Sequence, residues 1–304
     1  MDTQSSATVT KPSLKLGRHT LNMGEAWKFD TNEIFAHLDK AINEKSISKP
    51  RCSYPDGTRC ADPNLEPNQS IARKAAQGRK ENKSELDIEE HDPNNDDIPY
   101  WGLCDMLGLL MSLLADVSED ATREDYYLHI TALYGRWCYR LIGSAKKNLP
   151  FMFCSVWVTD SAARAERIFL GASRGGSTRN ASFRSAWNRK IKDARSDILD
   201  PELLKKLHDD IDKWPAGGKR GKPDLIKLGN CAETYPFAYL DKYHSEPWDN
   251  VHGLALRKNA ILRDHYGISD ILPHLRDPCP NCRWYIESRG GKPGNFEIRK
   301  ESPS

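Results

Sequence analysis

The chain has 304 residues, of which 38% are hydrophobic and 29% are charged, so it should form one large or two modest globular domains with some disordered stretches. No window is apolar and long enough to span a membrane, and the start Met-Asp-Thr-Gln lacks the apolar core of a signal peptide. The 8 cysteines therefore indicate reduced thiols and metal ligands, and we expect an intracellular protein of the cytoplasm or nucleus. The formal net charge of +2 neither favours nor excludes nucleic acid as a partner, which local charge has to decide.

The first half of the chain should be helical, with a polar excursion inside it. Residues 1–25 are polar and are predicted to be disordered. Residues 26–97 should hold one short helix followed by a linker rich in Pro, Asn, Asp, Glu, Lys and Ser. Residues 98–150 should form a helical region that packs on the domain after it, because their apolar side chains recur at helical spacing. The helices predicted in this half cover residues 31–44, 101–115 and 121–142.

The pattern changes at residue 151, where short apolar segments rich in β-forming residues begin. Residues 151–304 should form an α/β domain that is interrupted by a long insert at about 177–227. The predicted strands cover residues 151–158, 167–172 and about 251–256, and the insert has helical character around residues 182–196 and 201–214.

Two short motifs in this domain carry its chemistry. Cys231 begins the sequence Cys-Ala-Glu, and 48 positions later Cys279 begins the Cys-x-x-Cys pair that Cys282 completes. A catalytic zinc binds three protein ligands and keeps one position open for water, so three thiolates from these two segments suit one zinc ion per chain. Glu233 need not bind the metal, because it can take a proton from the attacking water and pass it to a departing amine.

Cys-Ala-Glu followed by Pro-Cys-x-x-Cys resembles the signature of the cytidine deaminase superfamily, written His/Cys-x-Glu with Pro-Cys-x-x-Cys. The resemblance covers about residues 151–300. It implies a cytidine-deaminase-like α/β fold, in which a mixed sheet is flanked by helices and zinc lies between two helix N-termini, one of them on a helix that bears Cys231 and Glu233. It implies hydrolytic deamination of cytosine, with Cys231, Cys279 and Cys282 as zinc ligands and Glu233 as the proton shuttle. The helical region before this domain and the long insert resemble, in general terms, divergent deaminases of fungi and of bacterial toxin systems.

The residue after the last cysteine is Arg283. Three thiolates on Zn²⁺ leave one negative charge, and many three-cysteine nucleoside deaminases place an Arg at this position. The resemblance therefore implies that Arg283 offsets the charge of the metal cluster, while a solvated Arg is the alternative.

A structural zinc site without catalysis is a second interpretation of the same thiols. Its fourth ligand would be Cys154, His265 or His274. This interpretation leaves the positions of Glu233 and Pro278 as coincidences.

Residues 164–195 form a basic stretch that starts before the insert and includes its first part. Aromatic side chains are interleaved with Arg and Lys in this stretch. Cations contact phosphates and aromatic rings stack on unpaired bases, so this stretch favours single-stranded DNA or RNA, or a flipped-out nucleotide, as the substrate. The residues predicted to bind it are Asn180, Phe183, Arg184, Trp187 and Arg189. Alternatively, Phe183 and Trp187 pack inward from a solvated helix.

Free cytidine, deoxycytidine or a nucleotide is the alternative substrate. Nucleic-acid editors more often use one His and two Cys, whereas this chain offers three Cys. The segment that begins at Asn180 also resembles the Asn-Ala-Ser-Tyr segment with which free cytidine deaminases bind ribose. In those enzymes it lies close to the zinc motif, whereas here the insert separates Asn180 from Cys231.

Overall fold

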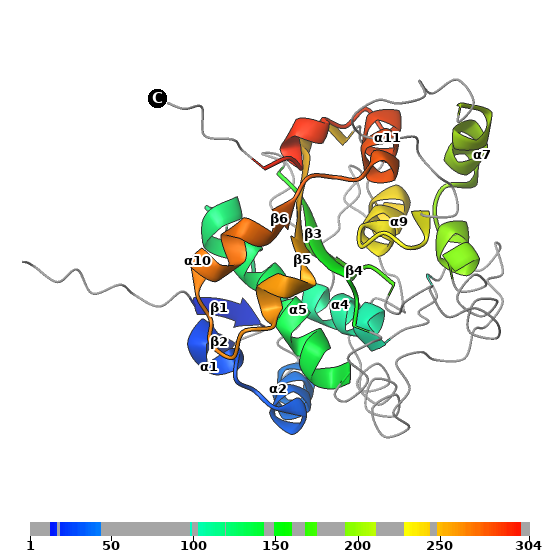
Figure 1. Ribbon diagram of the computed structural model, residues 1–304. Coiled ribbons are helices and arrows are strands. Elements are labelled where there is room, and N and C mark those ends of the chain that lie inside the picture. The colour runs from blue at the N-terminus through cyan, green and yellow to red at the C-terminus, as the bar shows by residue number, and fades with distance from the viewer. Residues whose placement is uncertain are drawn as a thin grey trace, which may run out of the picture.

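The protein is a mixed α/β structure with two antiparallel sheets, one of two strands and one of four (Figure 1). This computed structural model describes residues 13–16, 19–43, 98, 103–118, 120–142, 149–159, 168–174, 192–210, 228–243 and 248–298. Within these ranges, no helix is long and apolar enough to cross a lipid bilayer.

The four-stranded sheet is built around β3, which pairs with β4 on one side and with β5 on the other. Its strands are β3 (Met152–Val158), β4 (Ile168–Ala172), β5 (Val251–Arg257) and β6 (Leu275–Arg276), in the order β4-β3-β5-β6. Strands β3 and β4 are buried over most of their length and largely apolar, since helices cover both faces of the sheet. The strands predicted at residues 151–158, 167–172 and 251–256 are confirmed.

The sheet differs from the expected mixed one, because every strand pairing in the described part of the chain is antiparallel. Helix α11 (Pro280–Ser288) follows β6, and no strand follows it within the described residues. There the chain turns instead, with Gly290 at a φ of 73° and a 3-10 helix at Pro293–Asn295. Glycine and proline in this segment favour turns over a strand.

Different helices cover the two faces of the four-stranded sheet (Figure 1). Helices α4 (Leu103–Leu114) and α5 (Leu128–Ile142) lie on one face, where the ring of Phe153 contacts Tyr134. Helix α9 (Thr234–Tyr243) lies on the other face, where Tyr239 stacks on Phe169 of β4. Helix α11 packs on α9 in turn, since its Tyr285 stacks on Phe237.

The N-terminal segment is ordered from residue 13, where residues 1–25 were expected to be disordered. Strands β1 (Ser13–Leu16) and β2 (His19–Asn22) form an antiparallel hairpin, followed by α1 (Met23–Ala26) and α2 (Thr31–Asn43). The hairpin forms because Leu14 and Leu16 alternate with exposed residues and join the core. Trp137 of α5 donates a hydrogen bond to the carbonyl of Ala26, which fixes this segment to the helical region.

The other described elements are short. They are the π-helical turn Arg123–Tyr127, the helices α7 (Pro201–Asp210) and α10 (Ile268–Ile271), and the 3-10 helices Trp248–Asn250, Lys258–Ile261 and Leu272–His274.

The predicted helices at residues 31–44, 101–115, 121–142 and 201–214 are found, the last described over Pro201–Asp210. Of the helix expected around residues 182–196, only residues from 192 on are described, and they are helical. The predicted linker of residues 46–97 lies outside the described ranges. One cluster of buried apolar side chains extends from Leu14 to Phe296, so the helical region and the sheet share a core.

Candidate metal centre

Three cysteines from two distant segments meet near the N-terminal ends of helices α9 and α11. Cys231 lies in a turn three residues before α9, so neither it nor Glu233 sits within the helix that the resemblance implied. Cys279 is the N-cap of α11, and Cys282 lies in its first turn. The Sγ atom of Cys279 is 3.6 Å from that of Cys231 and 3.5 Å from that of Cys282, and all three lie within 4.8 Å of one another.

The spacing of the three sulfurs fits a thiolate metal site. Zinc–sulfur bonds of about 2.3 Å in tetrahedral geometry separate neighbouring sulfurs by about 3.8 Å, close to the two distances above. The cluster could therefore hold a metal ion. Soft thiolate ligands in a tetrahedral arrangement suit Zn²⁺ better than Mg²⁺ or Ca²⁺, which prefer oxygen.

The candidate fourth ligands of a structural zinc site do not join this group. Among the described residues, the cluster consists of three thiols and no further His, Cys, Asp or Glu. His265 is exposed and bonds Asp270 at 3.1 Å, while Cys154 is buried in β3 against Ala232. The described side chains of the cluster thus offer three ligand atoms to a metal ion.

The pKa values of the three thiols are shifted by their mutual contacts. Interaction with the Cys231 thiol and then with Cys282 lowers the pKa of Cys279 to about 3, whereas the same contacts raise the pKa values of Cys231 and Cys282. The cluster therefore shares protons among its sulfurs, and a cation would displace them. Cys279 and Cys282 also lie at the N-terminus of α11, whose partial positive charge stabilises thiolates.

Glu233 is buried beside the thiols, with its Oε2 atom accepting a hydrogen bond of 3.3 Å from Cys282. Burial, and next the charge of Cys279, raise the pKa of this carboxyl group to about 7. A carboxyl group with a pKa near neutrality can both accept and return a proton at neutral pH. Glu233 is not a member of the metal-binding group, which agrees with a role in proton transfer rather than ligation.

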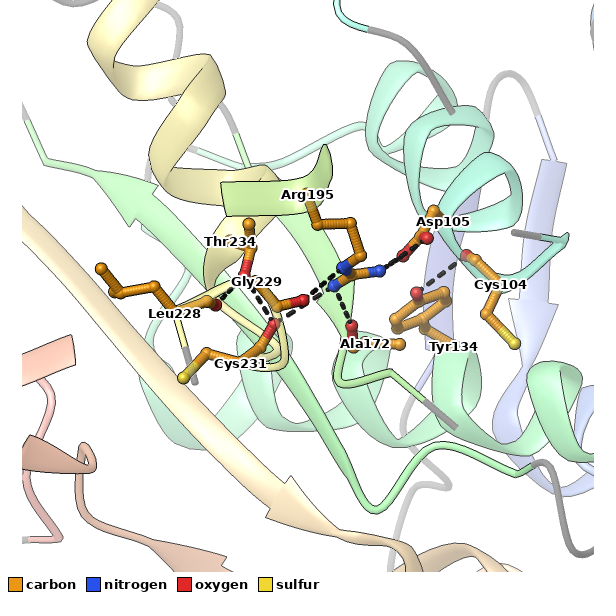
Figure 2. Close-up of polar contacts among 9 residues, drawn as sticks. All are labelled: Cys104, Asp105, Tyr134, Ala172, Arg195, Leu228, Gly229, Cys231 and Thr234. Atoms are coloured by element: carbon orange, nitrogen blue, oxygen red, sulfur yellow. Dashed lines mark hydrogen bonds and ion pairs between the residues drawn. The ribbon is translucent and has the colours of Figure 1, made fainter. Parts of the chain in front are cut away.

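The loop that carries Cys231 is held in place by a buried arginine, Arg195 (Figure 2). Its guanidinium group donates to the carbonyl oxygens of Gly229 at 2.7 Å, Ala172 at 2.9 Å and Cys231 at 3.2 Å. The same group bonds both carboxylate oxygens of Asp105, at 2.7 and 2.8 Å. Arg195 therefore fixes residues 228–233, the metal loop, to the end of β4 and to helix α4.

This arrangement corrects part of the sequence interpretation. Arg195 and Arg174 were counted among the cations of the basic stretch at residues 164–195, but both are buried, and Arg195 is bound by Asp105. The guanidinium group of Arg195 is therefore not placed to contact a phosphate. The signal for the ion pair was present in the sequence, because Asp105 interrupts an otherwise apolar helix and a buried carboxylate requires a partner.

Two glycines allow the metal loop to lie directly against its neighbours. A Cβ atom at Gly171 of β4 would come within 2.2 Å of the carbonyl oxygen of Ala232, and one at Gly229 within 1.8 Å of the carbonyl oxygen of Lys192. Both distances are too short for any side chain, so the backbone must be bare at these positions for Cys231 and Glu233 to reach the sheet.

Replacing Arg195 by Lys should weaken zinc binding by about 10- to 100-fold, the usual cost of losing a group that orients a metal ligand. Lysine keeps the charge that Asp105 requires but cannot reach three carbonyl oxygens at once. The matched control is Arg136→Lys. Arg136 is also fully buried and bonds the carbonyl oxygens of Trp27 and Ile261, but it contacts no part of the metal loop.

Both lysine variants should lower the melting temperature, whereas only Arg195→Lys should lose zinc affinity in competition with a chelating dye. Equal zinc affinities in the two variants would mean that Arg195 stabilises the fold without shaping the site.

The remaining predicted site residues stay predictions. Asn180, Phe183, Arg184, Trp187 and Arg189 lie outside the described residues. The Arg283 guanidinium group bonds Glu297 and lies 3.9 Å from a carboxylate oxygen of Glu287, so two carboxylates share its charge. Its predicted effect on the metal cluster is not tested by these contacts.

Comparison of the chain with protein-family models, with curated proteins and with solved structures found no match in any of the three.

Proposed function

We propose that the protein is a zinc-dependent deaminase that converts cytosine to uracil by hydrolysis. The observation that carries this proposal is the position of Glu233, a buried carboxyl group 3.3 Å from a sulfur of a three-thiol cluster that it does not join. Three ligands and an adjacent buried acid are the arrangement that hydrolysis at a metal requires. A structural zinc site needs no such acid.

The residues have distinct roles in this reaction. Cys231, Cys279 and Cys282 would hold the zinc ion, which when bound supplies the Lewis acidity that activates water for attack. Glu233 carries one proton of the attacking water to ring nitrogen N3 and the second to the leaving amino group, so that the ring exchanges an amino group for a carbonyl oxygen and ammonia departs. Burial raises the pKa of the Glu233 carboxyl group to about 7, so that the group can accept and then release a proton.

The preferred substrate is cytosine in single-stranded or flipped-out DNA or RNA. Support comes from the cations and aromatic residues of the sequence around the insert, of which Arg184, Trp187 and Arg189 are the ones that we propose to contact the strand. Free cytidine remains the competing substrate, because the ligand set consists of three cysteines.

The test is incubation of the zinc-loaded protein with free cytidine, single-stranded DNA, duplex DNA and RNA of matched sequence, with uracil or uridine as the readout. We expect uracil from the single strands, at a rate that falls as salt rises because phosphate contacts release counterions. Salt-insensitive turnover of cytidine alone would contradict the polymer substrate. Full zinc occupancy without product from any of the four would contradict deamination and leave a structural zinc domain.

A further inference from the structure

An exposed aromatic ring with two cations stands at the end of the four-stranded sheet. Phe151, directly before β3, is 50% exposed, the largest exposure among the large apolar residues described. The guanidinium carbon of Arg257 lies 5.6 Å from the centre of its ring, and the ammonium nitrogen of Lys258 lies 5.4 Å from it. The backbone N–H of Lys258 donates to the Phe151 carbonyl at 2.9 Å, which fixes the two segments together.

This aromatic–cation cluster, Phe151 with Arg257 and Lys258, lies at the end of the sheet that borders the metal loop. Met152, the next residue, packs against a small buried cluster of Cys154, Ala255 and Ala232, the last of which stands between the ligand Cys231 and Glu233. Arg257 is the register partner of Met152 on β5, and cross-strand partners project from the same face of a sheet. Arg257 therefore projects from the face of the sheet that packs against Ala232.

The two cations of the cluster have no carboxylate partner within the part of the chain that the structure describes. An ammonium and a guanidinium group beside an exposed ring offer positive charge and a stacking surface in one place. A polynucleotide presents the complementary chemistry, because phosphates alternate with flat bases along the strand. An acidic peptide would match the charges but supply no base to cover the ring.

We propose that the aromatic–cation cluster binds single-stranded nucleic acid next to the nucleotide that enters the metal site. A neighbouring base stacks on Phe151, and Arg257 and Lys258 contact the adjoining phosphates. This inference rests on the proposed function for the identity of the strand's target base, but the binding itself can be measured without turnover.

The experiment measures fluorescence anisotropy of labelled single-stranded DNA and RNA with full-length, zinc-loaded protein carrying Glu233→Gln, so that no substrate is consumed. Adding Phe151→Ala should weaken binding by about 5- to 100-fold, the usual range for loss of one stacked base. Adding Arg257→Ala with Lys258→Ala should lower the slope of log affinity against log salt by about 1.4 to 1.8, since each lost phosphate contact contributes about 0.7 to 0.9.

Matched controls remove the same chemistry elsewhere. Lys15→Ala with Lys28→Ala deletes two exposed cations of the N-terminal segment, and Leu272→Ala deletes an apolar side chain of 46% exposure. Both controls should leave affinity and salt slope unchanged. Cluster variants that melt at the wild-type temperature and bind the oligonucleotides as tightly as their parent would overturn the inference.

The two proposals can fail separately. Turnover of free cytidine by a protein that binds no oligonucleotide would overturn the cluster as a strand-binding site and leave the deaminase intact. Cluster-dependent binding by a protein with intact Glu233 that produces no uracil would support the binding site and contradict the reaction.

Discussion

Changing Glu233 to Gln should lower the rate of uracil formation by about 10²- to 10⁴-fold, the usual contribution of general acid–base catalysis, while zinc content stays at one ion per chain. Glutamine preserves the size of the side chain and can accept a hydrogen bond, but it cannot take up and release a proton. The zinc content should persist because Glu233 is not among the clustered ligands. Metal analysis and uracil release, measured on the same preparation, test both parts.

The control for this change is Glu202→Gln, which neutralises an exposed carboxylate on α7. It should leave both zinc content and activity at the wild-type level. A Glu233→Gln protein that retains a tenth of wild-type turnover would contradict the proton shuttle. One that loses zinc would make Glu233 a ligand and return weight to a four-ligand structural site.

The raised pKa of Glu233 adds a stability effect to the same variant. The carboxyl group has an ordinary pKa of 4.5 and a pKa of about 7 when buried in the folded, metal-free protein. The folded state therefore holds a proton that the unfolded chain has released, and the free energy of unfolding should decrease as pH rises from about 4.5 through about 7. Glu233→Gln should remove that part of the decrease, which melting curves of the metal-free proteins across this pH range can test.

Changing Cys282 to Ser should remove zinc and abolish activity, because it deletes the buried ligand of the cluster. Zinc sites in thiolate-rich peptides bind with about 10–16 kcal/mol of apparent free energy, so losing one ligand should also lower the melting temperature of the zinc-loaded protein. Atomic emission analysis and thermal denaturation with and without a chelator measure the two effects.

Cys138→Ser separates loss of metal from loss of stability. Cys138 is fully buried in α5 and lies outside the thiol cluster, so its change should disturb packing while zinc stays bound. If Cys282→Ser retained stoichiometric zinc, the assignment of the ligands would be wrong. If Cys138→Ser lost zinc to the same extent, the loss in Cys282→Ser would reflect unfolding rather than ligation.

The parts of the fold that depend on local pattern were predictable from the sequence. A short apolar run predicts strand β3, and apolar residues spaced three and four apart predict helix α5. Both elements were therefore found close to their true bounds. The meeting of Cys231 with Cys279 and Cys282 was predicted from the chemistry that three thiolates need, and the structure brings them together.

Features that depend on contacts between distant residues were missed. The hairpin at Ser13–Asn22 has only four residues in each strand, and its leucines gain burial only by packing on the helical region. Arg195 and Asp105 are 90 positions apart in the sequence, and periodicity along the chain does not predict which residue pairs with a buried charge. The antiparallel direction of every described strand pairing likewise depends on contacts between strands, and the family resemblance implied a mixed sheet instead.

The Asp105–Arg195 pair determines where this protein can be divided. A fragment that begins at residue 149 would retain Glu233 and the three thiols of the metal cluster but would lose Asp105. Arg195 would then be a buried charge without its carboxylate, which typically costs about 3–5 kcal/mol, comparable to the stability of a small domain. The helical region is thus part of the minimal unit, and two homologous chains could not exchange it freely by recombination unless both kept an acid and a base at these two positions.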